Sequence, residues 1–247
     1  MSWLSSRGSR NARAGGGRRQ QEAATPGGPE LHRSLALASL LEAMGKQSKL
    51  QVLDLGPAVG GNVEFLARFG CKLYIEDLYG ALAAHGPRPA GEPDRDLRGE
   101  PASRRSSGNG LPHSREWADS ALADRLFAEL LPFPPETRFD AVLAWDLFNY
   151  MERREVSALA RHLTRFCRPG ALLFALISIL KQIPAQPIRF RILDSERLAY
   201  EPRTTASRPC PRYAPAELDN WLRGFRLDRS FLMRHGIQEY LFVREQD

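Results

Sequence analysis

The sequence predicts an α/β protein: a three-layer α/β/α sandwich around a mostly parallel, doubly wound sheet. Segments typical of buried strands alternate along the chain with segments of helical periodicity. The strand segments are continuous apolar runs, as expected for a sheet that is covered by helices on both faces. Near the end of the chain, residues 225–245 alternate apolar and polar positions around His235-Gly236, which predicts an antiparallel hairpin at one edge of the sheet.

Four segments have the character of central strands. The first two, residues 49–56 (KLQVLDLG) and 71–77 (CKLYIED), begin about 20 residues apart, which is the length of one β-α-β unit. The third is 138–148 (RFDAVLAWDLF), and the fourth, fully buried one is 171–178 (ALLFALIS).

Helices are expected between these strands. In residues 30–45, leucines from Leu31 onward recur at near-helical spacing and the pattern closes on Gly45, a favourable stop. Residues 62–70 (NVEFLARFG) and 78–85 (LYGALAAH) are the next two expected helices. A further helix is expected over 151–170, ending in Pro-Gly.

Two stretches lack the composition of a folded core. Residues 1–29 form an Arg-rich segment that we expect to be a disordered basic tail. Residues 86–118 carry five Pro, five Gly and dense mixed charge, which predicts a mobile insertion. The remainder, residues 30–247, is expected to form a single domain. Outside these two stretches the chain is nearly neutral, so the formal charge of +6 is weak evidence for nucleic-acid binding.

The sequence favours a cytoplasmic protein. The longest apolar run, residues 171–180, is about half the length needed to cross a bilayer. The first 21 residues lack the apolar segment of a secretory signal, although their Arg and Ser content also describes an organelle transit peptide, so both interpretations stay open. The three cysteines have no metal-binding spacing, and we interpret them as reduced buried thiols, with no metal site.

The stretch QVLDLGPAVGGNVEFLARFG, residues 51–70, is the most informative part of the chain. It ends a buried strand on Asp54 and continues into a loop rich in Gly and Pro, at the edge where such sheets receive their ligands. Gly56, Gly60 and Gly61 lack a Cβ and therefore let backbone approach a ligand closely. The spacing fits neither G-x-x-x-x-G-K-[ST] nor G-x-G-x-x-G, which argues against a phosphate-binding loop.

The pattern D-x-G-x-x-x-G-x-N, filled by Asp54, Gly56, Gly60 and Asn62, resembles the first motif of the class I S-adenosylmethionine-dependent methyltransferases. Residues 131–151 (LPFPPETRFDAVLAWDLFNYM) look like the segment around the fourth strand of that superfamily, and FCRPGALLFALIS like its fifth strand. The terminal hairpin matches its sixth and seventh strands. The resemblance covers about residues 50–80 and 119–245.

The chain departs from the pattern of the superfamily at two places. Ala58, preceded by Pro57, stands where the superfamily usually has the middle glycine of the loop. Residues 120–130 (SALADRLFAEL), where a third strand should lie, are as helical as they are extended, so that strand is expected to be short or absent.

The resemblance implies S-adenosylmethionine as the cofactor and a set of site residues. Asp54 would orient the loop and the methionine amino group, and Asp146 would face the methionine end and the substrate as the catalytic residue. The cofactor-binding set is completed by Gly56, Gly60, Gly61 and Asn62 in the loop, Glu76 or Asp77 for the ribose hydroxyls, and Leu130 and Leu131 beside adenine.

Each of these residues also has a plainer interpretation. Asp54 could be a turn residue and Asp146 the N-cap of the next helix, while Trp145 and Tyr150 are interpreted as core. Between the two adjacent acids, Asp is the preferred N-cap residue and Glu is not. We therefore assign the ribose to Glu76 and the cap of the following helix to Asp77.

The predicted function is methyl transfer to a small-molecule acceptor. Residues 145–150 read WDLFNY and lack the N/D-P-P-Y/F signature with which related enzymes hold a planar nitrogen, which argues against a nucleobase or glutamine amide acceptor. Transfer from a sulfonium requires orientation rather than a metal or a covalent nucleophile. Two alternatives are a non-catalytic binding or assembly protein on the same fold, and an RNA methyltransferase that uses the basic tail.

Overall fold

The structure of the protein is a computed structural model that describes residues 30–85, 120–211, 213, 215–232 and 236–246. The predictions for the tail at 1–29 and for the insertion at 86–118 lie outside the described residues.

The central sheet has six strands, in the order β10-β11-β5-β4-β2-β3. Strands β3, β2, β4 and β5 are parallel to one another. In the C-terminal hairpin, β11 pairs antiparallel with β5, and β10 pairs antiparallel with β11, so β10 runs in the same direction as β5. The strands are β2 (Gln51–Asp54), β3 (Lys72–Ile75), β4 (Phe139–Trp145), β5 (Cys167–Ser178), β10 (Phe225–Leu232) and β11 (Ile237–Arg244). The predicted fold class is confirmed.

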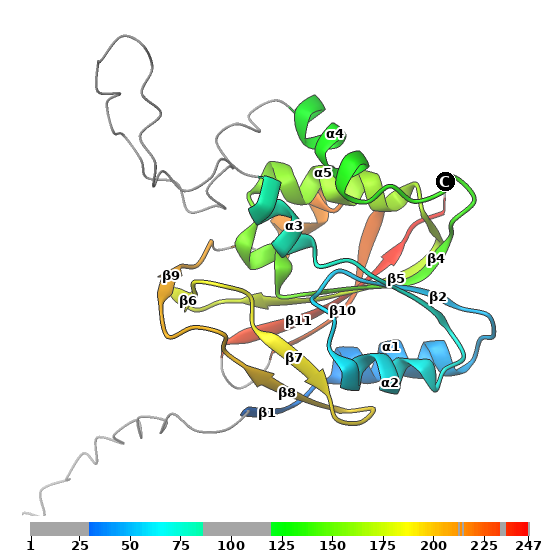
Figure 1. Cartoon of the computed structure of the whole chain (residues 1–247), viewed down its shortest axis with the longest axis horizontal. Helices are drawn as coiled ribbons and strands as arrows, with labels where there is room; N and C mark the ends of the chain where they lie inside the picture. Colours follow the sequence, from blue (N-terminus) through cyan, green and yellow to red (C-terminus); the bar gives the residue numbers. More distant parts are fainter. Residues whose placement is uncertain (1–29, 86–119, 212, 214, 233–235, 247) are drawn as a thin grey trace, which may run out of the picture.

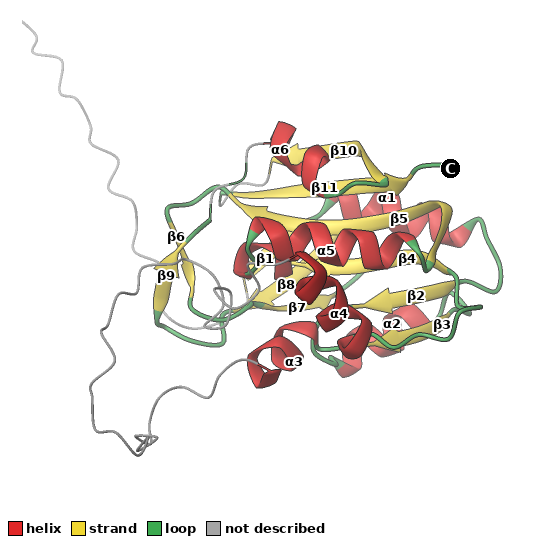
Figure 2. Cartoon of the chain, turned by 90° about the horizontal axis from the view of Figure 1, so that it is seen from above, coloured by secondary structure: helices red, strands yellow, loops and turns green. Residues whose placement is uncertain are grey.

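Helices cover both faces of the sheet, as Figures 1 and 2 show. On one face, α1 (Leu35–Gly45) and α2 (Gly60–Ala67) pack in one apolar core. On the other face a second core contains α3, α4, α5 and α6. These four helices are Leu78–His85, Ser120–Leu130, Arg153–Thr164 and Pro215–Trp221. Two separate cores with the sheet between them are the reason why the strands read as continuous apolar runs.

The beginning of α1 is stabilised both locally and from a distant strand. The side chain of Ser34 accepts a hydrogen bond of 3.2 Å from the backbone N–H of Leu37. Glu239 in β11 accepts a second one, of 2.9 Å, from the N–H of Ala36. A carboxylate is favourable at a helix N-terminus, so this contact joins α1 to the C-terminal hairpin.

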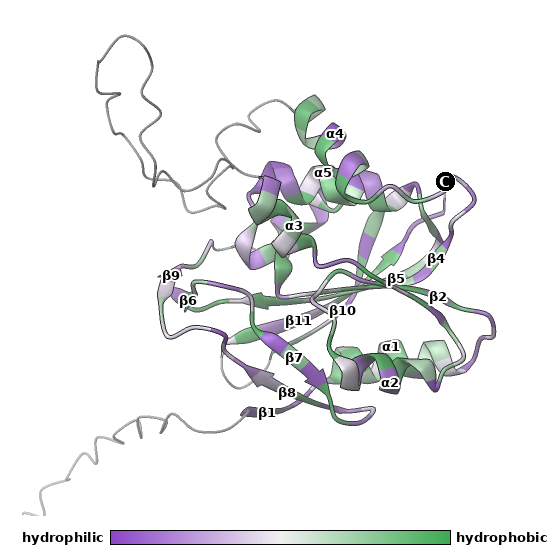
Figure 3. Cartoon of the chain, viewed as in Figure 1, coloured by the Kyte–Doolittle hydropathy of each residue, from purple (hydrophilic) through white to green (hydrophobic). Residues whose placement is uncertain are grey.

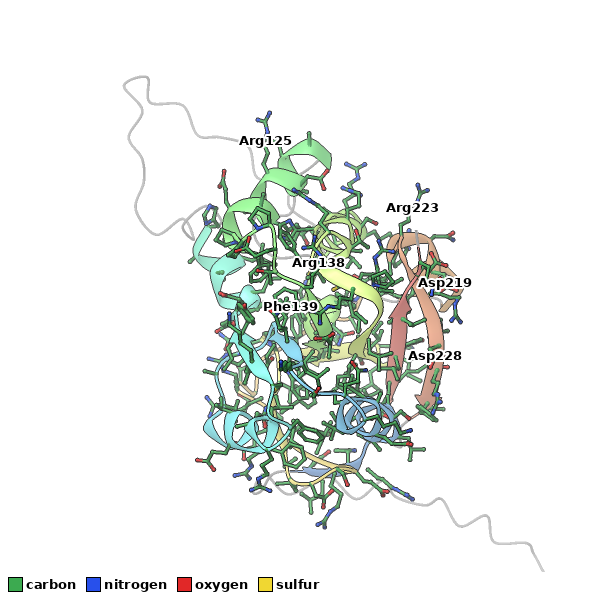
Figure 4. All side chains as sticks on the ribbon, turned by 90° about the vertical axis from the view of Figure 1, so that its right-hand side faces the viewer. Arg125, Arg138, Phe139, Asp219, Arg223 and Asp228 are labelled. Carbon is green, nitrogen blue, oxygen red and sulfur yellow. The ribbon has the colours of Figure 1, made fainter. Side chains whose placement is uncertain are left out.

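The colouring by hydropathy in Figure 3 shows that the apolar residues concentrate on the strands of the sheet and on the helix surfaces that pack against it. Phe139, at the start of β4, points into the interior and is fully buried, whereas Arg125 and Arg223 extend away from the molecule (Figure 4).

Three sequence predictions need correction or completion. Leu31 does not belong to the first helix but to the short strand β1 (Glu30–Arg33), where its side chain is 61% exposed. The helix expected to end in Pro-Gly ends earlier, at Thr164, and Gly170 lies inside β5 with a φ of +83°. Residues 120–130 form helix α4. Within the described residues, nothing therefore replaces the third strand, and β3 is the last strand on its side of the sheet.

The segment between β5 and the hairpin adds two small sheets that the sequence analysis did not assign. Strands β7 (Arg189–Ile192) and β8 (Arg197–Glu201) pair with each other and with β1. Strands β6 (Gln182–Pro184) and β9 (Ser207–Pro209) form a two-stranded ribbon. This segment contributes residues to the cavities at the carboxyl ends of β4 and β5. In the part of the chain that the structure describes, no helix has the length and apolar character needed to cross a membrane.

Candidate functional site

A cavity lies at the carboxyl ends of β2 and β4, where a doubly wound sheet receives its ligands. We call it the loop cavity. Its lining comes from the loop after β2, from the region after β3, from the end of β4 and from the β7 segment. Its lining includes Gly56, Asn62, Asp77, Trp145, Asp146, Ile188, Phe190 and Arg203.

Asp54 lies beneath the loop rather than in the lining of the cavity. Its Oδ1 accepts hydrogen bonds from the backbone N–H of Gly56 at 2.9 Å and from the indole Nε1 of Trp145 at 2.6 Å. Burial raises the pKa of the Asp54 carboxyl to about 6, although both hydrogen bonds favour its ionised form. The expected role in orienting the loop agrees with these contacts, while contact with a methionine amino group stays a prediction.

Gly56 is required by the indole of Trp145. A Cβ at position 56 would lie 2.8 Å from Cδ1 of that ring, which is too close for any other residue. Trp145 has a φ of +47° and stacks on Phe190 with ring centroids 5.6 Å apart. The absent side chain of Gly56 thus makes room for this indole, and both stacked rings line the cavity.

The remaining loop residues have different surroundings. A Cβ at Gly60 would meet nothing within 4 Å, and one at Gly61 would lie 3.7 Å from Cδ of Arg191. Both glycines are exposed at the start of α2. Asn62 is buried, with its Nδ2 donating to the backbone oxygen of Phe190 at 3.0 Å and its Oδ1 accepting from the N–H of Ile192 at 2.8 Å. Its amide therefore holds β7 against α2.

The two adjacent acids after β3 have separate environments. Oδ1 of Asp77 accepts a 3.0 Å hydrogen bond from the N–H of Gly80 in the first turn of α3. A Cβ at Gly80 would lie 2.9 Å from Oδ2 of Asp77, so any larger residue at position 80 would crowd the capping carboxylate. The predicted capping role of Asp77 is confirmed. Asp77 also lines the loop cavity, whereas Glu76 is half-buried beside it and its role at the ribose stays a prediction.

Leu130 and Leu131 lie at the end of α4 and are not in the lining of the loop cavity. Leu131 is fully buried in the core, and Nε2 of His162 lies 3.0 Å from its backbone oxygen. Contact of these leucines with adenine stays a prediction.

Asp146 stands in the wall between the loop cavity and a second one. It occupies the N-cap position of the 3-10 helix η1 (Leu147–Tyr150), as the plainer interpretation predicts, but its side chain makes no capping hydrogen bond there. Instead, its Oδ2 accepts a 3.0 Å hydrogen bond from the N–H of Ile188. Burial raises the pKa of the Asp146 carboxyl to about 7. A carboxyl with such a pKa can accept or release a proton near neutrality.

The second cavity, which we call the strand-end cavity, has a volume of about 230 Å³. It lies at the carboxyl end of β5, between η1 and the β6, β7 and β8 segments. Its polar lining includes Asp146, Asn149, Tyr150, Ser178 and Glu30. Asp146 and Ile188 line both cavities.

The sequence analysis missed the contribution of the β7 and β8 region, including Ile188, Phe190 and Arg203. A signal was present, because residues 188–192 alternate apolar and basic positions before Asp194-Ser195, as a strand leading into a turn would. Trp145 and Tyr150 are buried, as the core interpretation predicts, but both also line a cavity.

Comparison with solved structures finds distant similarity. A crystal structure of the PH0226 protein from Pyrococcus horikoshii OT3 is 15% identical, with 85% of this chain and 89% of that chain covered and a TM-score of 0.46. Magnesium protoporphyrin IX methyltransferase from Synechocystis PCC 6803 is 14% identical, with coverages of 85% and 77% and a TM-score of 0.41. The comparison with curated proteins finds no match.

The family comparison is more decisive. A family model described as a methyltransferase domain matches residues 30–225, which is most of the chain. The match spans the loop after β2, the carboxyl end of β4 and the β7 and β8 segment. The protein therefore belongs to the methyltransferase-domain family, within the class I S-adenosylmethionine-dependent methyltransferases.

Proposed function

We propose that the protein methylates a small-molecule acceptor, with S-adenosylmethionine in the loop cavity and the acceptor atom beside Asp146. The observation that carries this proposal is the position of Asp146 in the wall that the two cavities share. A methyl transferase needs two adjoining binding sites with the reacting atoms at their junction, and Asp146 is an ionisable side chain at such a junction.

The residues of the loop cavity suit the cofactor chemically. Arg203 supplies a positive charge for the methionine carboxylate. The N-terminus of α2 is also favourable for an anion, since its N-cap residue, Val59, has no side chain that could accept hydrogen bonds from the first turn. Asp77, or Glu76 beside it, supplies a carboxylate for the ribose hydroxyls.

The loop cavity has to widen before it can hold a nucleoside. Its volume is about 20 Å³, which is room for about one water molecule, whereas small-molecule sites usually measure about 300–1,000 Å³. The stacked rings of Trp145 and Phe190 are part of its wall. Because Phe190 belongs to the β7 segment outside the central sheet, we expect this segment to move when the cofactor binds.

The proposed reaction requires few reactive groups from the protein. When bound, the sulfonium supplies an electrophilic methyl carbon and leaves as a neutral thioether with the electron pair of the broken C–S bond. Proximity and alignment account for most of the catalysis in such a displacement. Asp146 would receive the proton that the acceptor nitrogen or oxygen loses as its bond to the methyl carbon forms, and a carboxyl with a pKa of about 7 suits this role.

A screen with methyl-labelled S-adenosylmethionine tests the proposal. The protein is incubated with a metabolite extract and, in parallel, with total RNA, and the labelled products are separated by size. We expect label in a small molecule, and about a hundredfold slower transfer with Asp146→Asn. Label in RNA alone, or an undiminished rate for Asp146→Asn, would contradict the proposal.

A further inference from the structure

We infer that the strand-end cavity is the acceptor site and that it selects neutral or cationic, mainly apolar molecules of one or two rings that carry an N–H or O–H group. The inference rests on the proposed function and adds the chemical class of the substrate.

The size of the cavity limits the acceptor. A volume of about 230 Å³ lies just below the range of about 300–1,000 Å³ that is usual for drug-sized ligands. A molecule with one or two rings fits such a space, whereas a nucleotide or a peptide segment does not.

Most of the wall is apolar. Leu176 comes from β5, Ile183 from β6, Ile237 from the start of β11, and Leu180 and Ile188 from the connecting segments. Burying an apolar ring against these side chains is favourable because it removes apolar surface from water. The acceptor is therefore expected to be held mainly by its apolar surface.

Several polar groups of the wall are already engaged with the protein. Asn149 donates to the backbone oxygen of Leu176 at 3.1 Å and accepts from the N–H of Ser178 at 2.9 Å. The hydroxyl of Tyr150 lies 2.9 Å from the backbone oxygen of Gln186. These contacts hold the side chains of Asn149 and Tyr150 in place, so the polar groups of a ligand have to pair with other residues of the lining.

The described lining of the cavity can carry negative charge near neutral pH but no positive charge. Among the described lining residues, the acids are Asp146, at the junction with the loop cavity, and Glu30, and there is no Lys or Arg. The guanidinium of Arg208 lies 5.8 Å from the centre of the Tyr150 ring, outside the lining. An anionic acceptor would be desolvated beside two carboxyls without a compensating cation, which is unfavourable.

Glu30 is held in place by its neighbours. It accepts a hydrogen bond from the hydroxyl of Tyr200, whose ring stacks on His32 with centroids 4.3 Å apart. Nε2 of His32 lies 3.5 Å from Oε2 of Glu30. The Glu30 side chain is 46% exposed, so its carboxylate can meet a cationic group at the rim of the cavity. Asp146 then receives the opposite, reacting end of the molecule.

Three probes of matched shape and different charge test the inference: tryptamine as the cation, 3-ethylindole as the neutral form, and indole-3-propionate as the anion. Their affinities are measured by NMR titration at neutral pH, with and without S-adenosylhomocysteine. We expect tryptamine and 3-ethylindole to bind at millimolar concentration or below, and the propionate to bind at least about tenfold more weakly. Intermolecular NOEs to the methyl groups of Leu180 and Ile183 locate the bound probe without any variant.

Two variants separate this cavity from the rest of the surface. Leu180 is 47% exposed and lines the cavity, so Leu180→Trp should weaken the binding of both favoured probes about tenfold or more. Leu122, 39% exposed on α4, is the matched control, and Leu122→Trp should leave their binding unchanged. Glu30→Gln should weaken the binding of tryptamine relative to that of 3-ethylindole, because it removes the carboxylate that meets the cationic group.

The inference is overturned if the propionate binds as tightly as tryptamine, if no probe binds at millimolar concentration, or if the NOEs locate the probes elsewhere. Titration of S-adenosylhomocysteine into the same samples distinguishes a failure of the acceptor class from a failure of the proposed function. If the cofactor binds and the probes do not, the acceptor class is wrong and the proposed function survives. If the probes bind as expected and the cofactor does not, the proposed function fails and the selectivity of the cavity stands.

Discussion

The indole Nε1 of Trp145 donates a 2.6 Å hydrogen bond to Oδ1 of Asp54, so the end of β4 fixes the carboxylate at the end of β2. The same oxygen accepts the N–H of Gly56. This contact joins the loop that identifies the family to the strand that carries Asp146, the next residue after Trp145. The geometry of the loop therefore depends on an aromatic residue about 90 positions away in the sequence.

Trp145→Phe should lower the stability of the protein in a pH-dependent way. The phenyl ring retains apolar contact with Phe190, but the hydrogen bond to the buried carboxylate is lost. We expect a loss of about 1–3 kcal/mol at about pH 8, where Asp54 is ionised. At about pH 5, below its folded pKa of about 6, the carboxyl is protonated and the loss should be smaller. Urea denaturation at both pH values measures the difference, and equal losses would show that the hydrogen bond to the ionised form has no effect.

The stability of the protein should also depend on pH through Asp146. Its folded pKa, about 7, is above the ordinary 3.8, so between these values the folded state keeps a proton that the unfolded state has lost. Stability from this group is therefore lost as pH rises from about 4 to about 7 and is constant above that, with a total of order 4 kcal/mol.

Asp146→Asn removes this titration and keeps an oxygen that can accept from Ile188. The variant should lose less stability than the parent as pH rises through that window. Buried His162, whose pKa is lowered by burial, acts in the opposite direction, but it is present in both proteins and cancels in the comparison. Parallel pH profiles of the two proteins would contradict the burial-driven shift.

Asn62→Ala should loosen β7 from α2. The substitution leaves the backbone oxygen of Phe190 and the N–H of Ile192 without their side-chain partner, at a cost of about 2–3 kcal/mol. Hydrogen exchange at the amide of Ile192 should become faster while amides in the centre of β5 keep their protection relative to global unfolding. If the Ile192 amide keeps its protection, the amide of Asn62 does not hold this strand.

The two acids after β3 should respond differently to substitution. Asp77→Ala should lower stability by about 1 kcal/mol, because Gly80 loses its capping partner. Glu76→Gln should leave stability nearly unchanged and weaken S-adenosylhomocysteine binding by about 1–2 kcal/mol, as expected for the loss of a charge-assisted hydrogen bond. Thermal melts and calorimetry on both variants measure the two effects. If Asp77→Ala weakens binding and Glu76→Gln does not, the ribose partner is Asp77.

The parallel strands of the central sheet could be predicted from the sequence. Long apolar runs such as 171–178, and the spacing of about 20 residues between the first two strands, have few other interpretations. The capping role of Asp77 could also be predicted, because the preference for Asp at a helix N-cap depends only on local sequence. The first helix was predicted to be too long because Leu31 fits the helical spacing. In the structure Leu31 belongs to strand β1, which pairs with β8. Tertiary pairing overrode the local pattern there.

The site was only partly predictable for a related reason. Position along the chain is enough to select Asp54, Gly56, Asn62 and Asp146 as candidate site residues. The hydrogen-bond partners of Asp54 and Asn62, however, are Trp145 and the backbone of β7, which lie far away in sequence. A single sequence does not encode such contacts in any local spacing. The stacking of Trp145 on Phe190 in the wall of the loop cavity likewise could not be inferred from either residue alone.

The most direct test of the cofactor site is a calorimetric titration of S-adenosylhomocysteine into the parent, Gly60→Val and Gly45→Val. A Cβ at Gly60 or at Gly45 meets nothing within 4 Å, so neither variant should disturb the fold beyond helix propensity. Gly45, at the end of α1, is therefore a matched control. We expect one-site binding to the parent and to Gly45→Val, and binding at least about tenfold weaker to Gly60→Val. Equal affinity in all three proteins would contradict a cofactor site built on the loop after β2.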